Sequence, residues 1–261
     1  MHSTLLERFA TLLKADSASV RSYLLDSERE AEVYYVPFEE VNIDAKLVLV
    51  GITPGPTQMN TAHRVAGVAL RGSLPAAGVL RKAKQTAAFD GMRPRINEML
   101  DHFMIPQKLG LNSAASLWGS NYDFFHPTSI IPNAAFKAGK YFNGPFNDVL
   151  SRTIFRREFE NGFVTTFAQL AKKPFVIAMG PVVDEAMKWC IANGAVAASQ
   201  YLGYLPHPSG NAGSQFSYFM RKKRIDDLKP KDPVRHRAAD LDAAYFVMAQ
   251  NVRERLDFTK S

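Results

Sequence analysis

Two loops of the sequence combine glycine and proline with a side chain that could take part in catalysis. The first, GITPGP (Gly51 to Pro56), follows an apolar run at 47–50, and its glycines and prolines fix the backbone around the Thr53 hydroxyl. The second, HPSGNAGS (His207 to Ser214), offers an imidazole, hydroxyls and backbone amides. A histidine can donate a hydrogen bond to a developing anion, and small residues can bring backbone amides to a phosphate. We expect the chemistry of the protein to lie in these two loops.

Short apolar strands alternate with helical patterns along the chain. Strands are expected at 46–50, 121–132, 174–180 and 200–205, the second of them broken at Pro127, and helices at 4–15, 93–103, 182–190 and 241–256. The polar, Ala-rich and Gly-rich stretch 57–90 has no sustained period and is expected to be an excursion over the functional face. This order predicts an α/β fold, a three-layer α/β/α sandwich around a central four-stranded, mainly parallel sheet. Functional loops of such sheets follow the carboxyl ends of the strands, as both of these loops do.

No composition shift or linker marks a domain boundary, so we expect a single domain over 1–261 with helical additions at both ends. Cys190 is the single cysteine, which excludes an intrachain disulfide and a zinc or iron-sulfur cluster, and fits a reducing cytoplasm. We expect no metal and no cofactor. The first 16 residues carry charges, and no segment approaches about 18 apolar residues, so secretion and membrane spanning are not expected.

The chain is basic, with 32 Lys and Arg against 25 Asp and Glu, a net charge of +7. Eight of these cations fall within the 17 residues of 221–237. Such a run is often only a solvated face, but its position just after the second loop favours contact with a nucleic-acid backbone. We expect Arg221 and Lys222 to contact phosphates.

A GxxPG turn after the first strand and an HPS loop after the last resemble the uracil-DNA glycosylase superfamily, most of all its single-strand-selective monofunctional and mismatch-specific branches. The resemblance covers about 44–220. It implies hydrolysis of the bond between a base and deoxyribose in a nucleotide extruded from the stack. His207 would then donate to the departing pyrimidine. The residues that would contact DNA are Gly55, Pro56, Ser209, Gly210, Asn211 and Ser214.

Three departures from that superfamily concern the catalytic and base-binding positions. Thr53 stands where the family has a water-activating Asp or Asn, and Asp123 is the carboxylate we name as a substitute. The segment 57–82 contains no aromatic residue to stack on uracil, so Tyr122, Phe124 or Phe125 would have to do so. No asparagine lies within 125–129 to read the base. The base-binding set is therefore Ile52, Phe124, Phe125, His126 and Thr128, with Asn133 as a further polar group.

These observations predict a monofunctional DNA glycosylase for a modified or bulky pyrimidine, such as a substituted base of phage DNA, which implies a role in anti-phage defence. Neither loop contains a lysine that could form a Schiff base, so strand cleavage is not expected. The alternatives are a classical uracil-DNA repair glycosylase, a catalytically silent module that binds DNA lesions, and a hydrolase or transferase for a small metabolite. The missing GxSxG motif counts against the last. We expect a monomer that binds single- or double-stranded DNA.

Overall fold

The computed structural model describes residues 3–14, 20–72, 74–208 and 213–256. The chain passes five times between two compact units, each built from three segments of the sequence. Unit 1 comprises Met1–Ile43, Gly51–Asp90 and His126–Ala171, and unit 2 comprises Asp44–Val50, Gly91–Phe125 and Lys172–Ser261. Each unit is described by itself below. The single domain expected over 1–261 stays a prediction.

A four-stranded parallel sheet has the order β4-β3-β7-β8. Its strands are β3 (Leu47–Gly51), β4 (Phe125–Ser129), β7 (Phe175–Met179) and β8 (Tyr201–Leu205). β3 pairs in parallel with β7 from Leu47 opposite Phe175, and β7 pairs in parallel with β8 from Val176 opposite Tyr201. Every residue of β3 is buried, as its unbroken apolar sequence predicts for a parallel strand. The predicted α/β class and four-stranded parallel sheet are thus confirmed.

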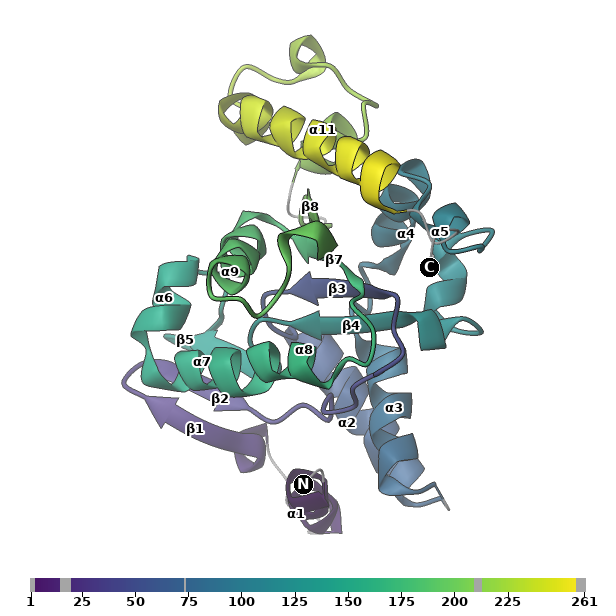
Figure 1. The fold of residues 1–261 in the computed structure, drawn as a ribbon. Coiled ribbons are helices and arrows are strands. Elements are labelled where there is room, and N and C mark those ends of the chain that lie inside the picture. Colours follow the sequence, from purple (N-terminus) through teal and green to yellow (C-terminus); the bar gives the residue numbers. More distant parts are fainter. Residues whose placement is uncertain (1–2, 15–19, 73, 209–212, 257–261) are drawn as a thin grey trace. The chain divides into compact units, whose positions relative to one another are not determined.

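The helices of unit 2 pack on the last two strands of this sheet. Helix α9 (Pro181–Ala192) contacts β7 and β8, and helix α11 (Ala238–Arg255) lies along β8 (Figure 1). Both were expected from their helical spacing. Helix α4 (Arg93–His102) also confirms the helix predicted at 93–103. The remaining helices of unit 2 are the short α5 (Ile105–Lys108) and α10 (Gln215–Phe219).

The second predicted strand is shorter than expected and continues through its proline. A 3-10 turn occupies Tyr122–Phe124, and β4 then runs without a break from Phe125 to Ser129, with Pro127 inside it. A proline lacks the N–H that a strand donates, so it fits only where one side of the strand is unpaired. β4 is the first strand of the sheet order and meets that condition.

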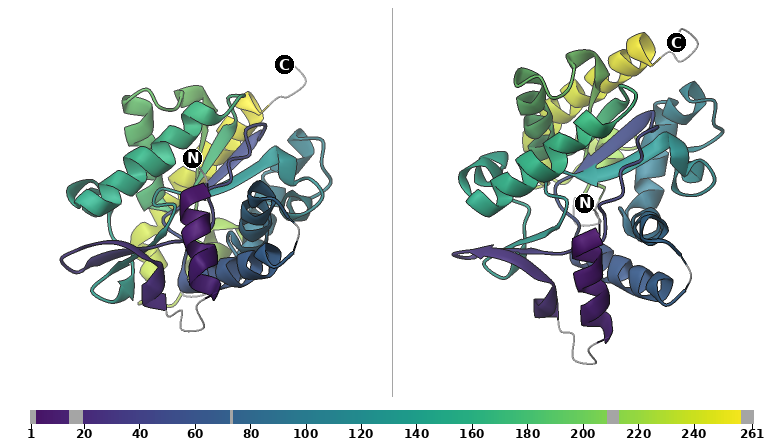
Figure 2. Two further views of the ribbon diagram at one scale, coloured as in Figure 1. Left: turned by 90° about the horizontal axis from the view of Figure 1, so that it is seen from below. Right: turned by 60° about the horizontal axis from the view of Figure 1, so that its bottom comes forward.

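Unit 1 contains an antiparallel sheet that the sequence reading did not predict. Its order is β1-β2-β5-β6, with β1 (Leu24–Glu28), β2 (Ala31–Tyr34), β5 (Ala134–Lys137) and β6 (Lys140–Tyr141). The β1–β2 hairpin is visible in both views of Figure 2. These strands are two to five residues long, too short to show a period.

The expectation of an irregular excursion over 57–90 was wrong. Helix α2 (Pro56–Leu70) and helix α3 (Ala76–Ala87) fill this stretch and pack against each other. Their buried faces consist largely of alanine and glycine, so the apolar period is weak although alanine is the best helix former. Helix α1 (Ser3–Lys14) confirms the helix predicted at 4–15. It packs on α2, which covers part of its apolar face.

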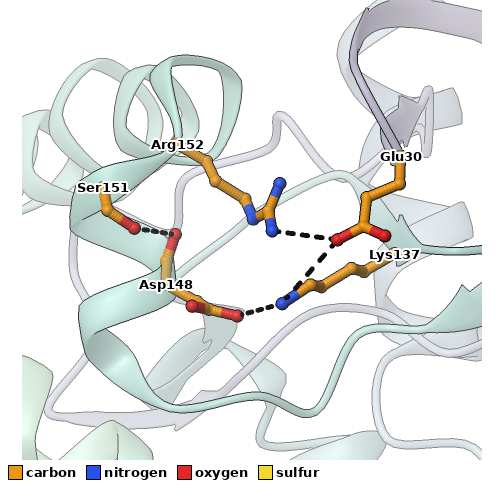
Figure 3. A network of polar contacts seen from close by, with 5 residues as sticks. All are labelled: Glu30, Lys137, Asp148, Ser151 and Arg152. Atoms are coloured by element: carbon orange, nitrogen blue, oxygen red, sulfur yellow. Dashed lines mark hydrogen bonds and ion pairs between the residues drawn. The ribbon is translucent and has the colours of Figure 1, made fainter.

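A polar network connects the β1–β2 turn of unit 1 to its helices (Figure 3). The Lys137 ammonium lies 2.6 Å from Asp148 and 4.0 Å from Glu30, and the Arg152 guanidinium lies 3.1 Å from Glu30. Asp148 lies in the first turn of α6 (Phe146–Ser151), and Arg152 directly follows this helix. The other helices of this region are α7 (Thr153–Arg157), the π-helical stretch Glu158–Val164 and α8 (Thr165–Gln169).

Candidate functional site

The Thr53 hydroxyl is tied to the backbone of β5 in unit 1. It donates to the carbonyl of Asn133 at 2.6 Å and accepts from the amide of Ala135 at 2.9 Å. Only 4% of the residue is exposed. The Tyr141 hydroxyl donates to the Thr53 carbonyl. The donor of the threonine is therefore used, and the geometry favours a role in fixing the loop.

The rest of the GITPGP loop is held by the segment that follows β4. The amide of Ile130 donates to the Gly51 carbonyl, and the amide of Ile131 donates to the Ile52 carbonyl, both at 2.9 Å. Ile52 is partly buried at the start of the loop. These bonds continue the pairing beyond the end of β4, so the backbone from Gly51 to Thr53 has a defined course.

Asn133, which the sequence reading left as a spare polar group, organises this region. Its side-chain oxygen accepts from the Val36 amide at 2.9 Å, and its side-chain nitrogen donates to Glu158 at 3.0 Å. Burial raises the pKa of Glu158, while the Asn133 hydrogen bonds act in the opposite direction. Asn133 thus bonds the Glu158 carboxylate through its side chain and accepts the Thr53 hydrogen bond through its backbone carbonyl.

Phe89 places an aromatic ring beside the first loop. It lies beyond the segment 57–82, which contains no aromatic residue. A Cβ built on Gly51 would lie 3.3 Å from two ring atoms of Phe89 and 3.3 Å from the Ser129 hydroxyl oxygen. The amide of Phe89 donates to the buried Gln58 side chain at 2.8 Å. Its position just after α3 is far along the sequence from the loop, so spacing alone could not have identified it.

Helix α2 begins directly at the first loop. Gly55 is its N-cap, without a side-chain cap, and Pro56 is its first residue. Amides at a helix N-terminus attract anions because the helix dipole and the unpaired N–H groups point outward. Pro56 is exposed and Gly55 partly so, which is compatible with the predicted phosphate contact.

His207 lies in unit 2, two residues beyond β8. The glycine that ends β7, Gly180, donates to the Leu205 carbonyl at 2.8 Å and has a positive φ of 94°. A Cβ on Gly180 would lie 3.9 Å from the Cβ of His207. Burial lowers the pKa of His207, so its imidazole is neutral at pH 7. A neutral imidazole can donate one hydrogen bond in a fixed direction.

Arg95 of α4 is a further residue that the sequence reading missed. Its guanidinium donates to the Pro208 carbonyl at 3.2 Å and lies 5.2 Å from the ring centre of Phe216. The two contacts fall on either side of the second loop. No sequence motif identifies this arginine, because its partners are a backbone carbonyl and an aromatic ring more than a hundred residues away.

Part of the second loop lies outside the described residues, namely Ser209, Gly210, Asn211 and Ala212. At the described end of the loop, the Ser214 hydroxyl hydrogen-bonds Asp232. The pKa of Asp232 is lowered mainly by a hydrogen bond from the Val234 amide and further by this bond from Ser214. Ser214 also accepts from the Tyr218 amide at 2.9 Å through its carbonyl.

The two predicted catalytic loops belong to different units: Thr53 lies in unit 1 and His207 in unit 2.

The basic run 221–237 is exposed over most of its length but several of its cations have carboxylate partners. Arg221 pairs with Asp242 and lies 4.2 Å from the ring centre of Tyr245. Lys222 pairs with Glu98 of α4. These two, named as phosphate contacts, therefore also stabilise unit 2.

Four of the predicted catalytic or base-binding residues lie in a turn or pack in the interior, as structural residues do. Asp123 is exposed in the turn before β4, and Phe124 is partly buried with the Lys46 ammonium 4.8 Å from its ring centre. Phe125 is fully buried and packs edge-on against Trp118 at 4.8 Å. His126 is fully buried, and its Nδ1 accepts from the Asn42 amide at 3.3 Å. Their burial or their place in the turn gives the assigned roles no support.

Thr128, the remaining base-binding candidate, is partly buried near the end of β4. Its neighbour in the strand, Ser129, reaches the space beside Gly51. β4 alternates its side chains between two faces, so Thr128 and Ser129 point to opposite sides. The residue of this pair that the structure brings to the first loop is Ser129.

Unit 1 also holds buried ionisable groups, of which the sequence analysis named His126 but neither Glu39 nor Lys84. The Tyr35 hydroxyl donates to Glu39 at 2.8 Å, and burial raises the pKa of Glu39 to about 7. Burial lowers the pKa of Lys84 to about 8, and its ammonium donates to the Glu40 carbonyl. Burial also lowers the pKa of His126. Three ionisable groups are thus shifted toward their neutral forms in one unit.

Within the described ranges, no helix is long and apolar enough to cross a membrane. The same part of the chain contains no group of three or more His, Cys, Asp or Glu side chains placed to hold a metal ion. Cys190 is buried, and burial raises the pKa of its thiol to about 12.

These features define an α/β protein with a parallel four-stranded sheet, a Gly/Pro turn after β3 and a histidine loop after β8. The sequence is 31% identical over 205 residues to the uncharacterized protein YoxB of Bacillus subtilis (strain 168), a match that covers 77% of this chain and 79% of YoxB. The chain belongs to the same family as YoxB. No protein-family profile matches the chain, and no solved structure matches it.

Proposed function

We propose that the protein is a monofunctional DNA glycosylase that hydrolyses the N-glycosidic bond of a flipped-out pyrimidine carrying a bulky substituent. The observation that carries this proposal is His207, a partly buried neutral imidazole in the loop that follows the last parallel strand. A donor held in one direction can stabilise negative charge that develops on a departing base. The HPS sequence around it is the motif of the uracil-DNA glycosylase resemblance.

Two features are suited to holding a DNA strand. Helix α2 starts at Gly55 without a side-chain cap, which leaves its N-terminal amides for an anion. The run 221–237 adds exposed cations in unit 2. Phosphate contacts of both kinds would offset the few kcal/mol that extruding a nucleotide costs.

The chemistry needs no base at Thr53. The bond between C1′ and the pyrimidine nitrogen breaks, and its electron pair leaves with the base, whose O2 receives the hydrogen bond of His207. Water then adds its oxygen to the cationic C1′, and the departing base anion takes the water proton. The products are the free base and an abasic sugar. In this scheme Thr53 fixes the loop, which accords with its bonds to Asn133 and Ala135.

The preference for a substituted pyrimidine and the anti-phage role rest on the sequence. The chain lacks the aromatic residue after the first motif and the base-reading asparagine that restrict family members to uracil. Phe89 supplies a ring beside Gly51. A base site without the usual aromatic residue and asparagine is expected to differ in shape from a uracil site. DNA is the proposed partner and the cytoplasm the proposed location.

The test is base release from DNA that contains uracil, a mismatch, or a pyrimidine with a bulky 5-substituent. Alkali breaks the strand at an abasic site, so a gel reports turnover directly. The proposal predicts cleavage after alkali with the substituted pyrimidine, and none before it. Release from uracil DNA alone would establish the repair alternative, and intact DNA of every kind would refute a glycosylase.

A second candidate is a module that binds modified or damaged DNA without cutting it. The observation in its favour is the Thr53 hydroxyl, whose proton is committed to the Asn133 carbonyl. Binding without base release in the same panel would establish this alternative.

A further inference from the structure

One arginine of unit 2 contacts both flanks of the histidine loop. Arg95 Nη1 donates to the Pro208 carbonyl at 3.2 Å, one residue after His207. The same guanidinium lies 5.2 Å from the ring centre of Phe216, the second residue of α10. Pro208 and Phe216 are both buried. A single planar group therefore spans the entry and the exit of this loop.

A second contact holds α4 and α10 in the same arrangement. Lys222, which follows α10, pairs with Glu98, three residues after Arg95 and on the same side of α4. The Lys222 ammonium also lies 5.4 Å from the ring centre of Phe216. Two cations thus approach one aromatic ring, and attraction between a cation and a ring face favours both contacts.

The strand side of the loop is fixed independently. The Gly180 amide donates to the Leu205 carbonyl at 2.8 Å, two residues before His207. His207 therefore stands between a backbone bond at 205 and the arginine bond at 208. Because the Leu205 and Pro208 carbonyls are both held, the backbone is restrained on either side of His207.

We propose that Arg95 is a positioning residue, which orients His207 by clamping Pro208 to the ring of Phe216. The catalytic part of this inference rests on the proposed function, whereas the positioning of His207 by Arg95 can be tested without it. Arginine is suited to this task because its planar guanidinium can donate in its plane and stack through its face at once. A lysine at 95 would keep the charge and could make only one of the two contacts.

The experiment compares Arg95→Lys and Arg95→Ala with Arg93→Ala in the full chain. Arg93 is the matched control, because it lies on the same helix and its guanidinium contacts Trp118, 4.5 Å from the ring centre. Three quantities are measured: the His207 pKa by NMR, amide hydrogen exchange of the peptide 204–216, and kcat and KM for base release. Thermal unfolding of each variant shows whether it is folded.

We expect both Arg95 variants to exchange this peptide about tenfold faster and to raise the His207 pKa toward 6.5, because the imidazole becomes solvated. We expect kcat to fall about tenfold or more, with a smaller change in KM, since a displaced donor weakens transition-state contacts. Arg93→Ala should leave all three near the wild-type values.

Arg95→Lys with wild-type exchange and a wild-type His207 pKa would overturn the inference. The same result for Arg93→Ala as for Arg95→Ala would also overturn it, because the effect would then be one of charge. Absence of base release in the wild type would instead refute the proposed function. Exchange and pKa would still decide the clamp, so the two failures are distinguishable.

Discussion

The Thr53 hydroxyl donates a 2.6 Å hydrogen bond to the Asn133 carbonyl, 80 residues further along the chain. Its oxygen also accepts from the Ala135 amide. A side chain used in this way fixes a loop against a strand. Thr53 therefore serves to hold the backbone. The proposed function assigns the stabilisation of charge to His207 instead.

Two substitutions of Thr53 separate the contribution of its hydroxyl to stability from that of its methyl group. Thr53→Val removes the hydroxyl, so the Asn133 carbonyl and Ala135 amide lose their partner, which should lower the free energy of unfolding by about 1–3 kcal/mol. Thr53→Ser keeps both bonds and should cost less than about 1 kcal/mol. Urea titrations of both variants measure the difference. A smaller loss for Thr53→Val than for Thr53→Ser would show that the methyl group, and not the hydroxyl, stabilises the loop.

Stability should fall with rising pH on account of Glu39. Burial raises the pKa of this carboxyl to about 7 in the folded protein, from 4.5 when it is solvated. Folding therefore favours the neutral form, and its advantage is lost as the pH rises from 4.5 through 7.

Glu39→Gln should remove this pH dependence, with a stability gain over wild type at pH 8 of up to about 3 kcal/mol. Glu185→Gln, at an exposed position on α9, is the control. The measurement is the urea midpoint of each variant between pH 4 and pH 8. An equal pH dependence in wild type and Glu39→Gln would contradict the assignment.

Gly180→Ala should disturb the segment that supports His207. The φ of 94° at Gly180 strains any other residue by about 1 kcal/mol or more, and the new Cβ would touch His207. Gly194→Ala is a matched control, because its φ of 73° gives a similar strain but no atom lies within 4 Å of its Cβ. Both should lower the unfolding temperature, whereas a shifted His207 NMR signal is expected for Gly180→Ala alone. A shift in both variants would mean that global strain moves His207.

Salt dependence tests whether the basic run binds DNA. Lys229 and Lys231 are exposed, and replacing both with alanine should reduce the slope of log K against log salt by up to about 2. Lys172→Ala with Lys173→Ala removes the same charge from another exposed pair. The control pair should change the slope by less than half as much. Equal slopes would show that only the net charge attracts DNA.

The sequence predicted the parallel sheet because two of its strands, β3 and β7, are short apolar runs followed by loops or helices. β3 and β7 are buried almost throughout, so their composition alone marks them. It failed for α2 and α3, whose alanine-rich buried faces give no strong period. It also failed for Pro127, because its tolerance depends on β4 being the first strand in the sheet.

The candidate site shows the same division between local and distant information. Gly51, Thr53 and His207 can be picked out from nearby glycines and prolines. Phe89, Asn133 and Arg95 cannot, because each acts on a backbone group or ring that lies far away in the sequence. Phe125 and His126 were chosen for their residue types, yet both are fully buried. Burial at that position is decided by packing, which the spacing of residues does not reveal.

The most direct test of the account is base release by wild type and His207→Ala, scored on alkali-treated gels with DNA that contains a 5-substituted pyrimidine. We predict release by the wild type and a loss of about 10²-fold or more in the variant, as for removal of a donor to a developing anion. Turnover of the variant within about twofold of wild type would contradict the central role given to His207.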